Sequence, residues 1–323
     1  MTVRRSGWKV TALCWVVAGG FAGWAAARVT AADRVRRTES VAVPLLSFTP
    51  QVAAAAPWAA LTLRLTRRKG PAAAAALAAG ALGAVVRSRG VSRPQPAVSG
   101  PVLRVLTLNL WHGQAVAEAL VTLARAASAD VVFVQELTAD AVPRLKQAGL
   151  EDLLPHTRVE LRHGSRGSGI YARLPLSEGP RVAPVRSAQP TALLELPTGE
   201  AVELVCVHPA APVVQRRDGA VQWRTELGVI PPPAGLPRVV AGDFNATLDH
   251  AVFRDVLGLG YTDAALQAGT ALTPTWGLPE KGAVLTLDHV LVDRSCAVLA
   301  CSVHAVPGSD HRAVFAVIQL PGR

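Results

Sequence analysis

The sequence predicts an α/β domain preceded by N-terminal transmembrane helices. Residues 1–86 hold three long apolar runs, whereas residues 101–323 alternate short β-branched runs with Ala/Leu-rich helical stretches and Gly/Pro-rich loops. That alternation is typical of an α/β protein with largely buried strands. Charge divides the chain near the same point: residues 1–100 hold 14 Lys or Arg against 2 Asp or Glu, and the remainder holds 19 against 21. The basic charge therefore flanks the apolar runs, as in membrane proteins.

The three apolar runs differ in how well they fit a bilayer. Trp8–Val29 matches a span of ~20 residues, and Val41–Leu65 is long enough to span despite its prolines. Pro71–Val86 has 16 residues, short for a ~30 Å hydrocarbon core unless it thins the bilayer or pairs with the second run as a hairpin. A cleaved signal peptide is the alternative for the first run. Two further apolar runs behind it favour a membrane anchor of two or three helices in residues 1–86.

The basic residues give little information on orientation. If all three runs span, seven Lys or Arg lie on each side of the membrane, which leaves almost no bias under the positive-inside rule. The Arg-rich start, Arg4 and Arg5, favours a cytoplasmic N-terminus and hence a multi-pass cell-membrane protein with an extracytoplasmic C-terminal domain. This orientation reverses if the third run does not cross. Residues 87–100 are polar, hold two prolines, and are interpreted as a linker.

Two classes of site receive no support from composition. The near-neutral charge of residues 101–323 argues against a broad surface for nucleic-acid phosphates. The four cysteines do not stand at zinc-ligand spacing, and Cys296 and Cys301 could form a disulfide only if the backbone turns between them.

Polar residues suited to phosphate chemistry stand where the apolar runs of the C-terminal domain end. These segments are Val102–Asn109, Val131–Glu136, Val202–His208, Val239–Asn245, Val284–Asp288 and the turn Gly308–His311. Asp243 and Asn245, two apart on a strand, point to one face. Glu136 closes a buried run and is costly to leave unpaired unless it meets a cation or solvent. A carboxylate such as Asp288 could hold the ring of His311 in one tautomer. The pattern predicts a metal-dependent phosphoesterase.

Several of these residues also have an ordinary structural explanation when taken alone. Asn109 is typical of a turn at a strand end, and His208 beside a proline is typical of a surface loop. Asp243 with Asn245 could cap the helix that follows. The joint occurrence of all the motifs in one order outweighs these separate explanations.

The segments resemble the endonuclease/exonuclease/phosphatase superfamily, the DNase I-like fold, over essentially all of residues 101–323 and in the family's order. The matching motifs are LTLNLW, VQE, GSGIYAR, CVHP, GDFN, LDHV and GSDH. The resemblance implies a two-sheet α/β sandwich with flanking helices. The arrangement with several N-terminal spans resembles bacterial membrane-anchored members of the superfamily.

The resemblance also implies a role for each matching residue. The implied metal ligands are Asn109, Glu136 and Asp310, for Mg²⁺ with Mn²⁺ as the alternative. The implied catalytic residues are His208, Asp243, Asn245, Asp288 and His311. Either Asp243 or His311 would activate the attacking water, Asp288 would orient His311, and His208 would donate a proton to the leaving group. His289, in contrast, is expected to be structural. His112 is expected to lie in a loop, with the rim of the site as the alternative, and Trp276 to be a core anchor or a substrate contact.

The sequence therefore predicts a membrane-anchored, Mg²⁺-dependent phosphodiesterase or nuclease-like hydrolase that cleaves a phosphoester by metal-assisted attack of water. Its expected partners are the membrane and a phosphoester substrate: a nucleic acid, a lipid headgroup or a small phosphoester. No protein partner is inferred. The first alternative is a lipid-headgroup or inositol-phosphate phosphoesterase. The alternative of another class is a catalytically silent membrane scaffold or receptor with the same fold, which the complete set of site residues disfavours.

Overall fold

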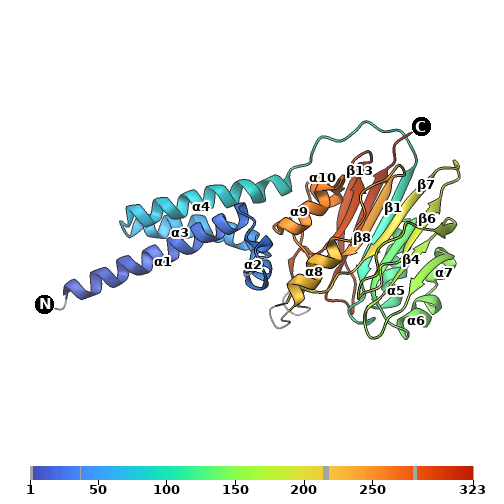
Figure 1. Cartoon of the computed structure of the whole chain (residues 1–323), viewed down its shortest axis with the longest axis horizontal. Helices are drawn as coiled ribbons and strands as arrows, with labels where there is room; N and C mark the ends of the chain where they lie inside the picture. Colours follow the sequence, from blue (N-terminus) through green and yellow to red (C-terminus); the bar gives the residue numbers. More distant parts are fainter. Residues whose placement is uncertain (1–2, 37, 214–217, 279–281, 323) are drawn as a thin grey trace.

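Two packed β-sheets, with a group of helices at one side, make up the molecule (Figure 1). The structure is a computed structural model that describes residues 3–36, 38–213, 218–278 and 282–322. Three of the flanking basic groups counted above, Arg37 and the side chains of Arg4 and Arg5, lie outside the described part. The predicted two-sheet α/β sandwich is confirmed.

The first sheet has six strands in the order β13-β14-β1-β2-β4-β3 among the described residues. Its strands are β1 (Val102–Asn109), β2 (Val131–Leu137), β3 (His156–Glu160), β4 (Gly167–Ala172), β13 (Ala297–Ala305) and β14 (Arg312–Gln319). The central pair, β1 and β2, is parallel, and the other neighbours are antiparallel. The carboxyl ends of β1 and β2 therefore lie at the same edge of the sheet.

The second sheet has the same plan, with the order β5-β6-β7-β8-β12-β9 and a central parallel pair, β7 and β8. Its strands are β5 (Leu176–Glu178), β6 (Thr191–Glu195), β7 (Ala201–Val207), β8 (Arg238–Asp243), β9 (Tyr261–Asp263) and β12 (Asp288–Asp293). A separate hairpin pairs β10 (Trp276–Leu278) with β11 (Gly282–Leu285).

Apolar side chains fill the space between the sheets, and helices cover their outer faces. Phe133 and Ile170 of the first sheet share one buried cluster with Leu204, Val239 and Val290 of the second. The covering helices are α5 (Ala117–Ala126), α6 (Ala141–Gln147), α7 (Leu150–Leu153), α8 (Gly219–Leu227) and α9 (Ala251–Gly258), whereas α10 (Ala264–Ala268) contacts a strand of each sheet and packs against the cluster between them. Because the central strands are apolar on both faces, they must be covered on both sides.

The described residues of the N-terminal segment form four α-helices and two short 3₁₀ helices. They are α1 (Val3–Val29), η1 (Ala32–Arg34), α2 (Glu39–Leu46), α3 (Thr49–Leu65), α4 (Lys69–Arg87) and η2 (Ser88–Gly90). The second apolar run, predicted as the single segment Val41–Leu65, is instead divided between α2 and α3. Pro50 stands at the second position of α3, where its missing N–H has no partner to lose, so a helix begins there readily.

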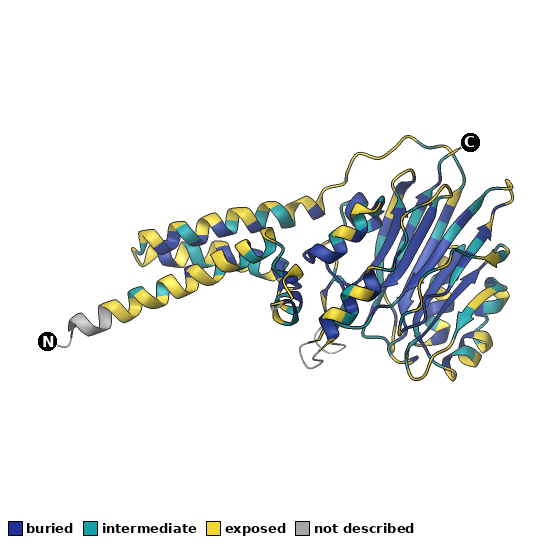
Figure 2. Ribbon diagram, viewed as in Figure 1, coloured by how far each residue is buried: buried dark blue, intermediate teal, exposed yellow. Residues whose placement is uncertain are grey.

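Helices α1, α3 and α4 pack side by side, and α3 and α4 form the hairpin that the sequence suggested (Figure 1). Small residues such as Ala18, Ala72 and Ala75 lie at their contacts, which allows a close approach. The outward faces are apolar and exposed, as at Trp58 (Figure 2). Among the described helices, Trp8–Val29 and the segment Lys69–Gly90 are long and apolar enough to cross a membrane. We call α1, α3 and α4 the helix bundle.

A buried ion cluster fastens the helix bundle to the sandwich. Asp249, in the loop before α9, is fully buried and accepts hydrogen bonds from two arginines. Arg28 at the end of α1 contacts it at 2.7 Å, and Arg89 of η2 contacts it at 2.8 Å. Because these partners stand about 60 residues apart in sequence, Asp249 also ties the ends of α1 and α4 together. Residues 87–100 therefore start from an anchored point.

Asp249→Asn is expected to lower the free energy of unfolding by ~3–5 kcal/mol, because it leaves two buried guanidinium groups without their counter-charge. The measurement is denaturant unfolding of the whole chain in detergent. Asp255→Asn is the matched control, because its ion pair with Arg34 lies in solvent and its loss should cost at most ~1 kcal/mol. Equal effects of the two substitutions would contradict the structural role of Asp249.

Candidate active site

The predicted site residues meet at the edge of the sandwich where both central parallel pairs end. Asn109 ends β1 and Glu136 stands near the end of β2, both in the first sheet. His208 follows β7 and Asp243 ends β8, both in the second sheet. Each sheet thus contributes two polar side chains to one place. They lie together because the two central strands of each sheet are parallel and therefore end at the same edge.

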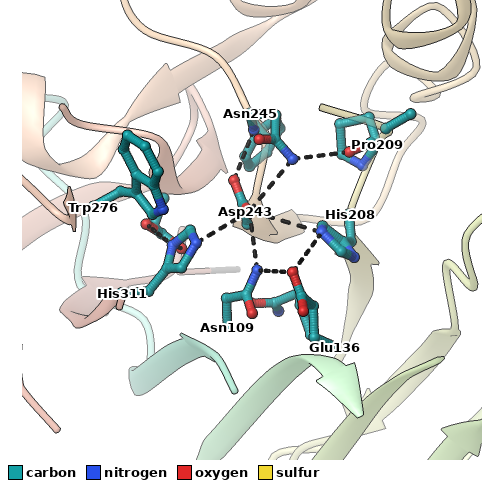
Figure 3. Close-up of polar contacts among 12 residues, drawn as sticks. Asn109, Glu136, His208, Pro209, Asp243, Asn245, Trp276 and His311 are labelled. Atoms are coloured by element: carbon teal, nitrogen blue, oxygen red, sulfur yellow. Dashed lines mark hydrogen bonds and ion pairs between the residues drawn. The ribbon is translucent and has the colours of Figure 1, made fainter. Parts of the chain in front are cut away.

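Asp243 lies at the centre of the site, with His311 on one side and His208 on the other (Figure 3). Its Oδ2 accepts a hydrogen bond from Asn109 Nδ2 at 3.1 Å and lies 3.7 Å from His311 Nε2 and 3.8 Å from His208 Nε2. Its Oδ1 accepts from the backbone N–H of Asn245 at 2.8 Å. Burial raises the pKa of this carboxyl, and the nearby imidazoles oppose that effect only in part.

His311 and Asp288 form a hydrogen-bonded pair, as predicted. Asp288 Oδ2 lies 2.8 Å from His311 Nδ1, and both side chains are buried. Burial alone would lower the pKa of the imidazole, but the carboxylates of Asp288 and Asp243 outweigh it and raise that pKa to about 10. His311 is therefore protonated at neutral pH in this arrangement, with Nε2–H directed at Asp243 and Asp310.

Glu136 occupies a bulge in β2 where the pairing with β4 shifts register. Its φ of 52° is left-handed, which is unfavourable for a non-glycine residue and is typical of functional sites. The bulge turns the carboxylate toward the edge of the sheet, where Oε1 accepts from Asn109 Nδ2 at 3.2 Å. Its Oε2 accepts from the backbone N–H of His112 at 2.7 Å. Asn109 thus donates to two carboxylates, Glu136 and Asp243, and its carbonyl oxygen is directed away from them to the Trp111 N–H.

Asp310 is held by Trp276 of the β10–β11 hairpin. The indole Nε1 donates to Asp310 Oδ2 at 3.0 Å, and the backbone N–H of Gly277 donates to the Asp310 carbonyl at 3.1 Å. Burial raises the pKa of the Asp310 carboxyl, and repulsion from Glu136 adds to this. Its second oxygen, Oδ1, is buried without a hydrogen-bond partner in the described part of the chain.

The first residue of the GDFN motif, Gly242, must be a glycine because the backbone of β8 passes very close to that of β7 there. Gly242 has a φ of 151°, and a Cβ there would lie 2.0 Å from the carbonyl oxygen of Val207 on β7. Only glycine lets β8 end at this distance from its neighbour. Asn245, with a left-handed φ of 48°, then turns the chain away and donates from Nδ2 to the Pro209 carbonyl at 3.0 Å.

The donor set fits a divalent cation near Glu136 and Asp310. Carboxylate oxygens are the ligands that Mg²⁺ prefers, and Oδ1 of Asp310 has no hydrogen-bond partner in the described part of the chain, with the nearest His311 nitrogen 3.9 Å away. Asp243, Asp288 and His311 also bring ligand atoms within 4.8 Å of one another. A metal ligand must be unprotonated, however, and the raised pKa of His311 keeps protons on both ring nitrogens at neutral pH. We therefore interpret that group as a proton-holding cluster beside the cation site.

A pocket of about 460 Å³ opens over these residues. Its walls include Trp111 and His112 from the loop after β1, Arg166 before β4 and Arg186 before β6. They also include Phe48, from the turn between α2 and α3.

The structure brings together all eight of the predicted site residues, and it also places two residues for which the sequence left alternatives. His112 lies in the loop after β1 and at the rim of the site, with Nδ1 3.2 Å from Glu136 Oε2. Trp276 contacts Asp310 directly. His289 is structural, as expected: its ring contacts Asp263 at 2.7 Å and the Ala246 carbonyl at 2.9 Å.

Cys296 and Cys301 are free thiols in the structure, so the disulfide left open above is not formed. Both lie in the apolar interior, where burial raises the pKa of each thiol to about 12.

A fold of two such sheets with carboxylates, imidazoles and amides at one edge defines a class of phosphoester hydrolase. The model of the Endonuclease/Exonuclease/phosphatase family matches residues 106–311, which is more than half of the chain. The chain therefore belongs to this family, whose endonucleases, exonucleases and phosphatases hydrolyse phosphoester bonds.

Solved structures share the fold at low sequence identity. An endonuclease/exonuclease/phosphatase from Beutenbergia cavernae is 22% identical, with a TM-score of 0.55 over 68% of this chain and 72% of its own. TDP2 of D. rerio, complexed with a single-strand DNA product, is 18% identical, with a TM-score of 0.55 over 68% and 99%. No functionally curated protein matches the sequence.

Asp288→Asn is expected to lower the pKa of His311 from about 10 toward its ordinary value of 6.5, because the imidazolium loses a carboxylate at 2.8 Å. An NMR titration of the ring in the metal-free protein measures this. Asp293→Asn, at the other end of β12, is the control. It removes the same charge from a residue that does not contact His311, and it should leave the pKa of His311 near 10. An unchanged pKa in Asp288→Asn would refute the assigned pair.

Proposed function

We propose that this protein is a membrane-anchored, Mg²⁺-dependent phosphoesterase that cleaves its substrate by attack of water. The observation that carries the proposal is the convergence of Glu136, His208, Asp243 and His311 from both sheets on one pocket. A scaffold or receptor has no need to bury two carboxylates and a protonated imidazole together, since each is costly to desolvate.

Asp243 is the group we assign to activating the water. Its raised pKa makes it a better proton acceptor, whereas a protonated His311 has no lone pair to offer. The proposal therefore takes Asp243 rather than His311, the two bases that the sequence left open. His311 would donate from Nε2 to a phosphoryl oxygen, with Asp288 holding its ring, and stabilise charge that develops there.

The remaining side chains take supporting roles. His208 would protonate the leaving group, and the amide of Asn245 would donate to a non-bridging oxygen. Glu136 and Asp310 would hold the cation, with Asn109 fixing the carboxylate of Glu136. When bound, Mg²⁺ would supply Lewis-acid polarisation of the phosphoryl group. Mn²⁺, which accepts the same oxygen ligands, is the alternative ion.

The chain is proposed to have three parts: a membrane anchor in residues 1–86, a linker in residues 87–100 and the catalytic domain in residues 101–323. The helix bundle supports the anchor, because its outward faces are apolar and exposed. Its helices run alternately, so that the N-terminus and the sandwich lie at opposite ends of it (Figure 1). Three crossings would therefore place the active site across the membrane from the N-terminus, and we propose the extracytoplasmic side.

The general test is a panel of phosphoesters presented to the whole chain in detergent with Mg²⁺: DNA, RNA, inositol phosphates and phospholipids. Hydrolysis of at least one class supports the proposal. A nuclease is the competing candidate within the family, since a structure of the same fold holds a single-strand DNA product. Preference for DNA over all other classes would favour it.

Removal of the metal is expected to abolish turnover. EDTA should stop hydrolysis and excess Mg²⁺ should restore it. Glu136→Gln should lower turnover by ~10²-fold or more, because the cation loses a charged ligand and with it several kcal/mol of transition-state stabilisation. Glu151→Gln, which removes a surface carboxylate paired with Lys146, is the control and should retain full activity. Activity that persists in EDTA would contradict the metal dependence.

Reporter fusions are expected to place the C-terminus outside the cytoplasm. Alkaline phosphatase joined after Arg323 should be active and a green fluorescent protein there should be dark, because each reporter functions on one side of the membrane only. The same reporters joined after Leu65, at the far end of α3, should give the opposite pattern. A fluorescent fusion after Arg323 would show that the number of crossings is even.

A further inference from the structure

We propose that helix α2 and the turn after it form part of the substrate-binding pocket, and that the substrate is a membrane lipid carrying a phosphoester. The phosphoester would reach Asp243 while the apolar part of the lipid lies against Phe48. This inference rests on the phosphoesterase function proposed above and adds the class of substrate.

The pocket over Asp243 is not formed by the sandwich alone. Pro44, Ser47 and Phe48 of the N-terminal segment line it together with the site residues Glu136 and Asp243. All three are uncharged, and the aromatic ring of Phe48 is 41% exposed. An exposed phenylalanine beside buried carboxylates marks a place for an apolar group next to a phosphate.

Pro44, Ser47 and Phe48 form what we call the α2 wall of the pocket, and buried contacts hold it in place. Val43 of α2 is 1% exposed and belongs to the apolar cluster of Trp223 and Phe253 on the outer face of the second sheet. His250 fixes the backbone: its Nδ1 accepts from the Thr247 N–H at 2.9 Å, so that Nε2 donates to the Val43 carbonyl at 2.8 Å. The wall is therefore a fixed part of the sandwich surface.

The same turn leads directly into the helix bundle. Phe48 immediately precedes α3, and the next residue, Thr49, accepts a hydrogen bond from the indole of Trp24 in α1 at 3.1 Å. From this point the exposed surface of the bundle is apolar, as at Trp58 and Leu65. A lipid could therefore place its phosphoester in the pocket while most of its chain stays in the bilayer.

The charges around the pocket agree with an anionic headgroup. Among the residues that the structure describes, the pocket lining holds two guanidinium groups, Arg166 and Arg186, and both come from the sandwich. The α2 wall contributes no cation among its lining residues. A nucleic acid needs cationic groups along its whole path, whereas a lipid needs them only at the headgroup.

The test compares, for each of three headgroups, a lipid with long acyl chains and a lipid with short acyl chains. The whole chain, reconstituted in phosphatidylcholine vesicles with Mg²⁺, is given phosphatidic acid, phosphatidylglycerol and phosphatidylinositol phosphate in dioleoyl and dihexanoyl forms. Soluble bis(p-nitrophenyl) phosphate is assayed alongside. The dioleoyl form of at least one headgroup should be hydrolysed at least tenfold faster than its dihexanoyl form.

Phe48→Ser should lower hydrolysis of that dioleoyl lipid at least tenfold more than hydrolysis of the soluble diester, because one apolar contact of a phenylalanine is lost. Phe48→Leu retains an apolar side chain and should recover most of the loss, which separates contact from folding. Leu299→Ser, which changes an exposed apolar residue of β13 on the sandwich outside the pocket, is the control and should match the native chain.

The outcomes separate the two proposals. Hydrolysis of the soluble diester without hydrolysis of any vesicle lipid would overturn the lipid inference and leave the phosphoesterase standing. Equal losses on lipid and soluble substrates in Phe48→Ser, or faster hydrolysis of DNA than of every lipid, would also overturn it. Absence of hydrolysis of all substrates would contradict the phosphoesterase itself.

Discussion

The burial of Asp243 between two sheets is the constraint on which the rest of the site depends. A carboxylate that is 2% exposed would be costly without partners, by several kcal/mol. Its partners come from separate parts of the fold: Asn109 from the first sheet, the Asn245 backbone from its own strand end, and His311 from the turn before β14. The charge is compensated only when both sheets are packed in register, so the site and the sandwich form together.

The loop after β8 carries the contacts of the sandwich to the N-terminal helices. This loop begins at Asn245 and contains Asp249, which binds Arg28 and Arg89, and His250, which contacts α2. The same loop is held to the second sheet, because His289 contacts the Ala246 carbonyl at 2.9 Å. Only a few residues therefore separate the central carboxylate of the site, Asp243, from the attachment of the helix bundle.

Local pattern was sufficient to predict the α/β class, and the resemblance of the motifs to a known family supplied the two-sheet sandwich and the eight candidate site residues that the structure brings together. Buried strands appear as apolar runs, and a polar residue at the end of such a run must face the sheet edge, as Asn109 and Asp243 do. The bulge at Glu136 could not be predicted from local pattern, because the backbone conformation of Glu136 depends on how β2 pairs with β4. The contact of Trp276 with Asp310 likewise joins residues 34 apart, through a hairpin whose position the sequence does not state.

The prediction was least complete where the N-terminal helices meet the sandwich. The physical reason is that the residues that contact the sandwich there have the same composition as a membrane span and its flanking charges. Arg28 and Arg89 have the sequence context of charges that flank a membrane span, yet both bind Asp249 in the fold. Val43 has the context of a span, yet it packs against Trp223. Hydropathy cannot distinguish a residue that meets lipid from one that meets another part of the chain. The two arginines that neutralise the buried Asp249, Arg28 and Arg89, both come from the N-terminal segment, so the contact between the helix bundle and the sandwich is part of the fold and holds the bundle in one place relative to the pocket.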